Sequence, residues 1–165
     1  MTTLVDKDAC ELLDADHIAV KHLFVAYARL AFGSDSGSSA DKLSLARKIC
    51  SELTLHARIE EEIFYRALRE VIDEPRLLDQ AQAEHQAAKG LIAQIEGLAM
   101  ADAKMDGLVA ELNRVVEQHV REERDDLFPK ARTSGLDLDA LGDQLRERQQ
   151  ALTAGGKPAR GSRAR

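Results

Sequence analysis

Three short interruptions divide most of the chain into four long segments whose apolar residues recur at helical spacing. The interruptions are Gly33–Ser39, Asp73–Pro75 and a softer stretch of small and acidic residues at Ala101–Gly107. Each contains residues typical of turns or helix starts. The expected helices span residues 8–32, 41–72, 76–99 and 106–131, with a short fifth helix over 138–152. Pro129 lies in the last turn of the fourth segment, so that helix is expected to end a residue or two early.

Four helices of about 25 residues joined by short links favour an all-α, up-down-up-down four-helix bundle with a short C-terminal fifth helix. Strand-like alternation of useful length is absent from the sequence. The chain of 165 residues fits one domain, which we assign to residues 1–152. Residues 153–165 contain four basic residues, no acid and no apolar period, which predicts a basic disordered tail.

Composition excludes several classes of protein. The formal net charge of −6 argues against a nucleic-acid-binding body, and no apolar run approaches the ~20 residues of a membrane span. The first residues lack the basic and apolar regions of a secretory leader. The two cysteines, Cys10 and Cys50, have no metal-type or disulfide-framework spacing. We expect a cytoplasmic protein that binds neither nucleic acid nor membranes; its oligomeric state stays open.

Each of the four expected helices carries one histidine on its apolar face. His17, for example, follows Leu13 by four residues and precedes Val20 by three. The four inward histidines are His17, His56, His85 and His119. A lone inward histidine is ordinarily a core residue with a hydrogen-bond partner, but one per helix is a different pattern. His22 lies about 140° around the helix from His17 and points elsewhere.

Two glutamates share the faces of two of these histidines. His56 and Glu60, and likewise His119 and Glu123, form H-x-x-x-E pairs. Residues four apart lie on one face of a helix, with Cβ atoms about 6 Å apart. In an up-down bundle, residues equally distant from an intervening turn lie at one level. This rule places all four histidines and both glutamates near one level of the core.

Buried ionised glutamates cost several kcal/mol each unless a cation compensates them. The apolar faces offer no clear inward Lys or Arg except Lys89, whereas a metal would use every histidine and both acids. Imidazole and carboxylate without thiolate suit iron, manganese or zinc. Six ligands suit two metal ions, with carboxylates bridging them and room for a small exogenous ligand. Ferritin-type bundles use E-x-x-H pairs instead.

The ordered set H, HxxxE, H, HxxxE resembles the hemerythrin-like, or HHE cation-binding, family. Asp16-His17-x-x-Val20-Lys21-x-Leu23-Phe24 resembles the family's first-helix motif, and His56-x-x-x-Glu60-Glu61-x-Ile63-Phe64-Tyr65 resembles the second. Glu84-His85 resembles the third, and His119-x-x-x-Glu123 followed by Leu127-Phe128-Pro129 the fourth. The resemblance covers about residues 8–150 and includes a C-terminal extension.

The resemblance implies a non-haem di-iron site, with iron preferred to manganese or zinc. The implied ligands are His17, His56, Glu60, His85, His119 and Glu123. Oxygen-carrying hemerythrins place a second histidine four residues after the third-helix ligand, where this chain has Lys89. This departure argues against reversible oxygen carriage. Glu84 is expected to support a ligand from outside the centre, and Glu61, Glu62 and Glu122 to lie at the surface.

Two functions follow as hypotheses. The first is a di-iron protein that binds, senses or reacts with a small oxidant such as dioxygen, peroxide or nitric oxide. The second is an iron-responsive interaction or regulatory module without turnover. Peroxide- or nitric-oxide-directed activity stays open, and no residue is assigned as catalytic.

Overall fold

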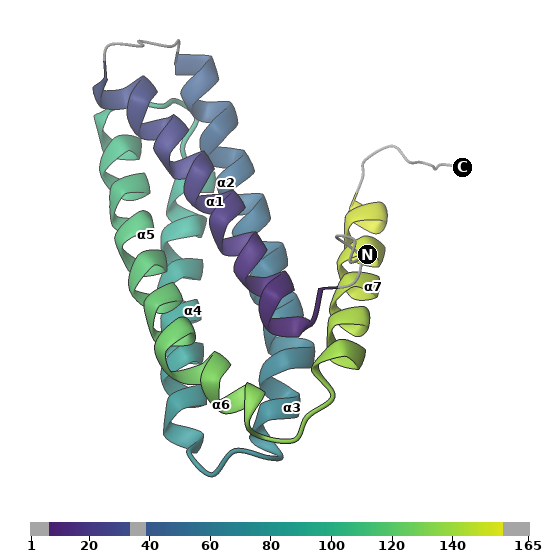
Figure 1. Cartoon of the computed structure of the whole chain (residues 1–165). Helices are drawn as coiled ribbons and strands as arrows, with labels where there is room; N and C mark the ends of the chain where they lie inside the picture. The colour runs from purple at the N-terminus through teal and green to yellow at the C-terminus, as the bar shows by residue number, and fades with distance from the viewer. Residues whose placement is uncertain (1–6, 34–38, 157–165) are drawn as a thin grey trace.

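The computed structural model describes residues 7–33 and 39–156. Its helices, in chain order, are α1 (Ala9–Phe32), α2 (Ser39–Ile59), η2 (Glu60–Phe64), α3 (Tyr65–Arg69), α4 (Pro75–Glu96), α5 (Ala103–Glu122), η3 (Glu123–Leu127), α6 (Phe128–Arg132) and α7 (Leu138–Gly156). Four antiparallel rods, α1, α2–η2–α3, α4 and α5–η3–α6, form the bundle, and α7 lies beside it (Figure 1). Among the described residues there is no strand.

The helix starts follow from their capping residues. Asp8 caps α1 in a reciprocal capping box with Glu11, and Asp102 accepts from two backbone N–H groups at the start of α5. Pro75 occupies the first turn of α4, where its missing N–H costs nothing. No described helix is long and apolar enough to cross a bilayer.

The second and fourth rods each contain one π-helical turn, η2 and η3, which begins at a glutamate. The N–H of Tyr65 donates to the carbonyl of Glu60, and the N–H of Phe128 to that of Glu123. The fourth rod therefore does not end a residue or two before 131, as Pro129 suggested, but continues to Arg132. The wider π-turn precedes Pro129 and relieves the clash that its ring makes in a regular α-helix.

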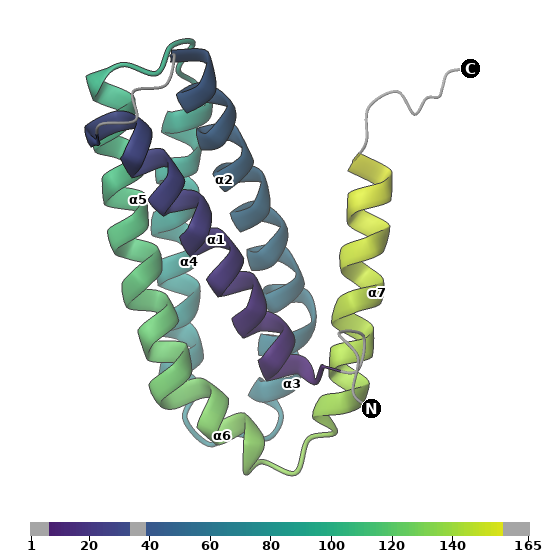
Figure 2. The same ribbon diagram turned by 45° about the horizontal axis from the view of Figure 1, so that its top comes forward.

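The fifth helix packs on the bundle through a close backbone approach. A Cβ on Gly142 would lie 2.6 Å from the carbonyl oxygen of Lys7, so only glycine allows this contact with the start of α1. Leu141 and Leu145 of α7 join the core of the bundle, Leu152 packs against it, and α7 lies beside the four rods (Figure 2). The helix runs to Gly156, so residues 153–156 of the expected basic tail are helical. Residues 157–165 lie outside the described residues.

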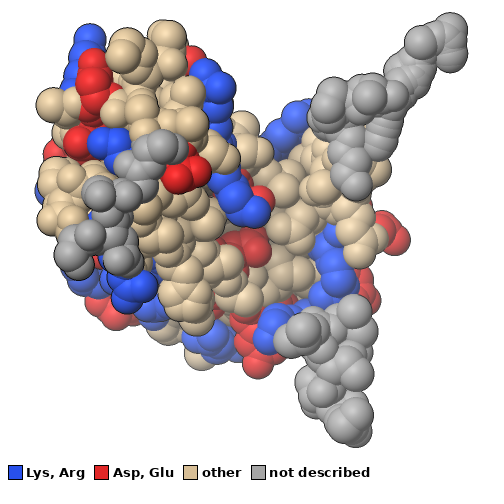
Figure 3. Space-filling view, turned by 90° about the horizontal axis from the view of Figure 1, so that it is seen from above, with Lys and Arg blue, Asp and Glu red and all other residues tan. Residues whose placement is uncertain are grey.

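The core consists of two apolar clusters. One, near α3, α6 and α7, includes Leu13, Phe64 and Leu78; the other, near the opposite end, includes Phe24, Ile49 and Leu112. Along each rod the predicted histidine falls where one cluster gives way to the other. A polar layer thus crosses the middle of the apolar core. At the end of the bundle where α1 ends and α2 begins, acidic and basic side chains are interspersed, and neither sign of charge dominates this face (Figure 3).

Candidate metal centre

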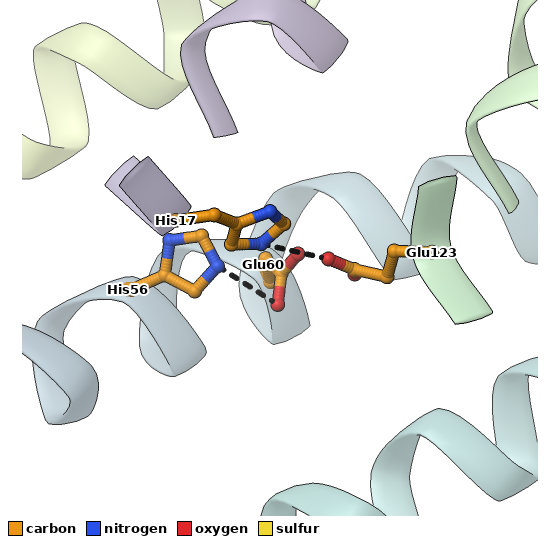
Figure 4. Close-up of side chains that lie close together, drawn as sticks. All are labelled: His17, His56, Glu60 and Glu123. Carbon is orange, nitrogen blue, oxygen red and sulfur yellow. Dashed lines mark ion pairs between the residues drawn. The ribbon is translucent and has the colours of Figure 1, made fainter. Parts of the chain in front are cut away.

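The six side chains expected to converge are all buried and lie together in the middle of the bundle. Glu60 and Glu123 are 0% exposed, and the histidines are 5–8% exposed. Figure 4 shows His17 of α1, His56 and Glu60 of the second rod, and Glu123 of the fourth pointing toward one another. Four rods therefore contribute to a single buried cluster.

The cluster consists of two groups that share Glu60. In the first, one potential ligand atom each from His17, His56, Glu60 and Glu123 lies within 4.8 Å of the others. In the second, Glu60, His85 and His119 meet the same limit. The Nε2 atom of His85 lies 3.1 Å from Glu60 Oε1 and 3.2 Å from His119 Nε2. The arrangement has two adjacent positions for a cation, with one carboxylate common to both.

Four buried atoms at this point have no hydrogen-bond partner: His17 Nε2, His56 Nε2, Glu60 Oε2 and Glu123 Oε1. His17 Nε2 lies 3.0 Å from Glu123 Oε1, but the pair lacks hydrogen-bond geometry. A buried polar atom without a partner costs about 1–3 kcal/mol, and more when it is charged. Electron-pair donors that face one another in this way are what a metal ion requires, so the residues present fit a metal centre.

The outer nitrogen of every histidine in the centre contacts a carboxylate. The pairs are His17–Asp14 at 3.2 Å, His56–Asp16 at 3.0 Å, His85–Glu61 at 2.6 Å and His119–Glu84 at 2.8 Å, each through Nδ1. A proton on Nδ1 that is donated to the acid leaves Nε2 as the free donor toward the centre. These contacts fix the orientation of all four rings.

Three of these acids reach from one rod to the histidine of the next. Asp16 on α1 reaches α2, Glu61 on η2 reaches α4, and Glu84 on α4 reaches α5. Each is the chain neighbour of a residue of the centre. The contact between the fourth and first rods is of another kind. There Arg124 of η3 donates at 2.6 Å to Asp14 of α1.

Tyr65 is buried against the second group of the centre. Its hydroxyl donates to Glu123 Oε2 at 2.6 Å and lies 3.1 Å from Glu60 Oε1. It also lies 3.2 Å from His119 Nε2. Burial and then the two carboxylates raise the pKa of Tyr65 well above its ordinary value, so the phenol keeps its proton.

Phe128 occupies the corresponding place in the first group. Its ring stacks on His17 with centroids 6.0 Å apart and planes inclined by 13°. Tyr65 follows Glu60 by five residues, and Phe128 follows Glu123 by five. In a regular α-helix such residues lie about 140° apart, but the five-residue bond of a π-turn stacks one above the other. The π-turns thus bring both aromatic rings to the centre.

Positive charge is what the electrostatics of the centre favours. Burial lowers the pKa of His56, but the carboxylates of Glu60 and Asp16 together outweigh it and raise the pKa to about 10. Burial also lowers the pKa of His119, yet Glu123, Glu60 and Glu84 together leave it well above the ordinary value. Without a metal, protons on these rings supply the charge that the two buried carboxylates need.

A cavity of about 40 Å³ adjoins the centre. All four histidines line it, together with apolar side chains that include Val20, Ile92 and Val116. A water molecule needs at least about 10–15 Å³ of such volume, so the cavity admits a molecule of two or three heavy atoms. A larger organic substrate does not fit beside the histidines.

The structure brings the six predicted residues together, and Glu84 contacts His119 from outside the centre. It corrects the expectation for Glu61, which accepts from His85 instead of lying only at the surface. Lys89 is not an inward cation, because its half-exposed amine pairs with Glu61. His22 is exposed as expected.

Three residues at the centre, Asp14, Asp16 and Tyr65, were not assigned from the sequence. Asp16 follows a recognisable pattern, since it precedes His17 as Glu84 precedes His85. The position of Tyr65 depends on a π-turn, for which the sequence offered no signal.

The sequence profile of the Hemerythrin HHE cation binding domain matches residues 8–131. Among solved structures, a hemerythrin HHE cation binding domain-containing protein from Mycobacterium kansasii is similar, with 22% sequence identity and a TM-score of 0.74. The match covers 90% of this chain and 89% of that chain, and at this identity it shows a common fold. No curated protein matches the chain.

Proposed function

Because the chain belongs to the hemerythrin HHE cation-binding domain family, we propose that its buried centre holds two iron ions that bind, sense or react with a small oxidant. The observation that carries the proposal is the set of four buried, partnerless nitrogen and oxygen atoms that face one another across the bundle. The two groups of potential ligands supply a place for each ion, with Glu60 common to both.

The donor set supports iron. Histidine nitrogen and carboxylate oxygen suit iron, manganese and zinc, whereas the soft thiolates that favour zinc-only structural sites are absent from the centre. Burial raises the pKa of Cys10 and of Cys50 to about 12, so both remain neutral thiols. A bound iron pair would supply an exchangeable coordination position and a change of oxidation state.

The protein's own residues hold and limit this chemistry. Tyr65 donates to Glu123 at 2.6 Å and lies 3.1 Å from Glu60, so its hydroxyl holds the two carboxylates beside each other. The carboxylates behind each imidazole fix the direction of its Nε2 atom. The cavity favours dioxygen, peroxide or nitric oxide over larger substrates because its volume is only about 40 Å³.

The test is metal analysis and an absorption spectrum of freshly purified protein, followed by addition of peroxide or nitric oxide. We expect about two irons per chain and a spectral response to the oxidant. Glu60→Ala should abolish both, whereas Glu52→Ala, an exposed acid on the same rod, should leave both unchanged. Colourless zinc-loaded protein that resists iron reconstitution would contradict the di-iron proposal.

Turnover separates an enzyme from a sensor. Catalytic consumption of peroxide that Glu60→Ala and His119→Ala abolish supports an enzyme, and stable ligand binding without consumption supports a sensor. A regulatory module is the second candidate, because partnerless charges in the middle of the core make the fold depend on metal occupancy. Metal-dependent melting without any response to oxidants supports that candidate.

A further inference from the structure

A groove of about 430 Å³ runs between α1 and α5, which lie side by side in the bundle (Figures 1 and 2). Residues of α1, α5 and η3 line it, and among them is His17 of the centre. Its floor contains Phe24, Val116 and Val120, and the half-exposed Ile18 lies at its edge. The groove is an order of magnitude larger than the cavity beside the histidines.

The groove and the inner cavity share one wall. His17, Val116 and Val120 are the three residues that line both spaces. His17 is held by Asp14, but the two valines are half-buried and have only van der Waals contacts to hold them. Side-chain motion of this kind takes place in picoseconds to nanoseconds when packing permits it. A single layer of side chains therefore separates solvent in the groove from the cavity.

The other seams of the bundle are crossed at this level by hydrogen bonds to a histidine. Asp16 crosses from α1 to α2, Glu61 from η2 to α4, and Glu84 from α4 to α5. Between α1 and the fourth rod, two ion pairs cross on either side of His17 instead. They are Arg124–Asp14 and Lys21–Glu117. Lys21 and Glu117 are well exposed, and ion pairs between exposed side chains add little to stability.

We propose that the α1/α5 groove is the entrance to the centre and that Val116 and Val120 form its gate. The inference rests on the proposed function, because it concerns the small ligand of the iron pair. Three cations line the groove, Lys21, Arg121 and Arg124, against the two acids Glu117 and Asp125. This balance favours small neutral molecules and monovalent anions over cations.

The test measures azide association and dissociation with the iron-loaded full chain by stopped-flow absorption. Val120→Phe and Val116→Phe should each slow both rates at least about tenfold, which corresponds to about 1.4 kcal/mol of barrier. The equilibrium dissociation constant should change by a much smaller factor than the two rates, because a gate acts on the path, and the valines also line the cavity. Val120→Ala should accelerate both rates and remains informative if a larger side chain prevents folding.

Two matched variants exclude indirect effects. Val25→Phe adds the same bulk on α1 outside the groove and should change neither rate. Leu53→Phe fills the cavity from α2 without touching the groove and should weaken azide binding at equilibrium.

A third variant tests the charge of the groove. Lys21→Glu should slow the association of azide several-fold more than that of neutral nitric oxide, and added salt should reduce the difference.

Unchanged azide rates in folded, iron-loaded Val120→Phe, Val116→Phe and Val120→Ala would overturn the groove proposal alone. Iron-loaded wild-type protein that binds neither azide nor nitric oxide would overturn both this proposal and the proposed function. A change in the dissociation constant that accounts for the whole effect of the valine variants would also overturn the gate.

Discussion

The two halves of the centre repeat one geometry and differ in one aromatic ring. The rings of His17 and His56 have centroids 4.9 Å apart with planes inclined by 62°, and those of His85 and His119 are 4.7 Å apart and inclined by 61°. The first pair packs against Phe128, and the second contacts the hydroxyl of Tyr65. We refer to them as the Phe128 half and the Tyr65 half.

The two halves differ in how many of their buried nitrogen and oxygen atoms have a hydrogen-bond partner. All four partnerless ligand atoms belong to the first group or to the shared Glu60. In the Tyr65 half, the phenol and the two imidazoles contact one another and the carboxylates. The Phe128 half is therefore the part of the metal-free centre with the greater need for a cation, and the Tyr65 half is partly satisfied without one.

The largest expected effect separates the shared carboxylate from the one in the first group only. Glu60→Ala should reduce bound iron from about two per chain to nearly none, because both ions lose a ligand. Glu123→Ala should retain about one ion, in the Tyr65 half. Elemental analysis with calorimetric melting checks this, and about two irons in Glu60→Ala would contradict the shared role.

A second prediction concerns pH, because each half holds one imidazole of raised pKa. Metal must displace the proton that His56 keeps up to about pH 10, and likewise the proton on His119. Between pH 6.5 and 8.5 the affinity of the Phe128 half should rise about 100-fold, or tenfold per pH unit for the proton released, and that of the Tyr65 half should rise in the same direction. Competition with a chelator measures it, and a flat profile would show that neither imidazole holds a proton.

The free energy of unfolding of the metal-free protein should fall as pH rises, whereas the metal affinity should rise. The raised pKa of His56 contributes stability that is fully present below its ordinary value of 6.5 and is lost as pH rises through about 10. Thermal melting of metal-free protein should therefore decline over this interval, while that of iron-loaded protein should not.

Tyr65→Phe makes the two halves alike and should destabilise the metal-free protein by about 2 kcal/mol, because the buried Glu123 carboxylate loses its donor and Glu60 loses a polar contact. Tyr27→Phe is the matched control, since its hydroxyl donates at 2.7 Å to Asp106 far from the centre. The control should lose stability too, but its iron spectrum should match the wild type. An unaltered iron spectrum in Tyr65→Phe would show that the phenol has no influence on the bound pair.

The smallest effect is expected at the acids that contact the outer nitrogens of His17 in α1 and His85 in α4. Glu61→Gln and Asp14→Asn should each weaken iron binding by about tenfold, the lower end of the range for such outer partners. Glu61 should have the larger effect, since its contact with His85 is 2.6 Å against 3.2 Å for Asp14 and His17. Chelator competition at fixed pH gives both values, and a reversed order would show that Arg124 matters more than the distance.

The sequence was sufficient to predict the bundle and the meeting of the six residues at the centre. Four apolar periods with one histidine each determine both the helices and their level, because regular helices convert spacing directly into position. The conversion assumes the constant rotation per residue of an α-helix, and it gives wrong positions beyond a π-turn. For that reason Tyr65 at the centre was not foreseen, nor was a fourth rod that Pro129 does not shorten.

Contacts between rods were also beyond reach from one sequence. Glu61 was expected at the surface, since a residue beside a buried ligand lies about 100° from it around the helix. Only the packing of η2 against α4 brings it to His85. The entrance groove likewise depends on the spacing of α1 and α5, which no local pattern encodes.

The paired π-turns have a consequence for how such a centre can diverge. The motif H-x-x-x-E-x-x-x-x-aromatic occurs twice, ending in Tyr65 and in Phe128, and each copy follows a helix with a single acid–histidine pair. The bundle is thus two like helical hairpins joined in tandem. Two identical hairpins assembled as a symmetric dimer would have to carry the same ring on both sides of the centre. Joining them in one chain frees each copy to change alone, so a phenol can face one side of the centre and a bare ring the other.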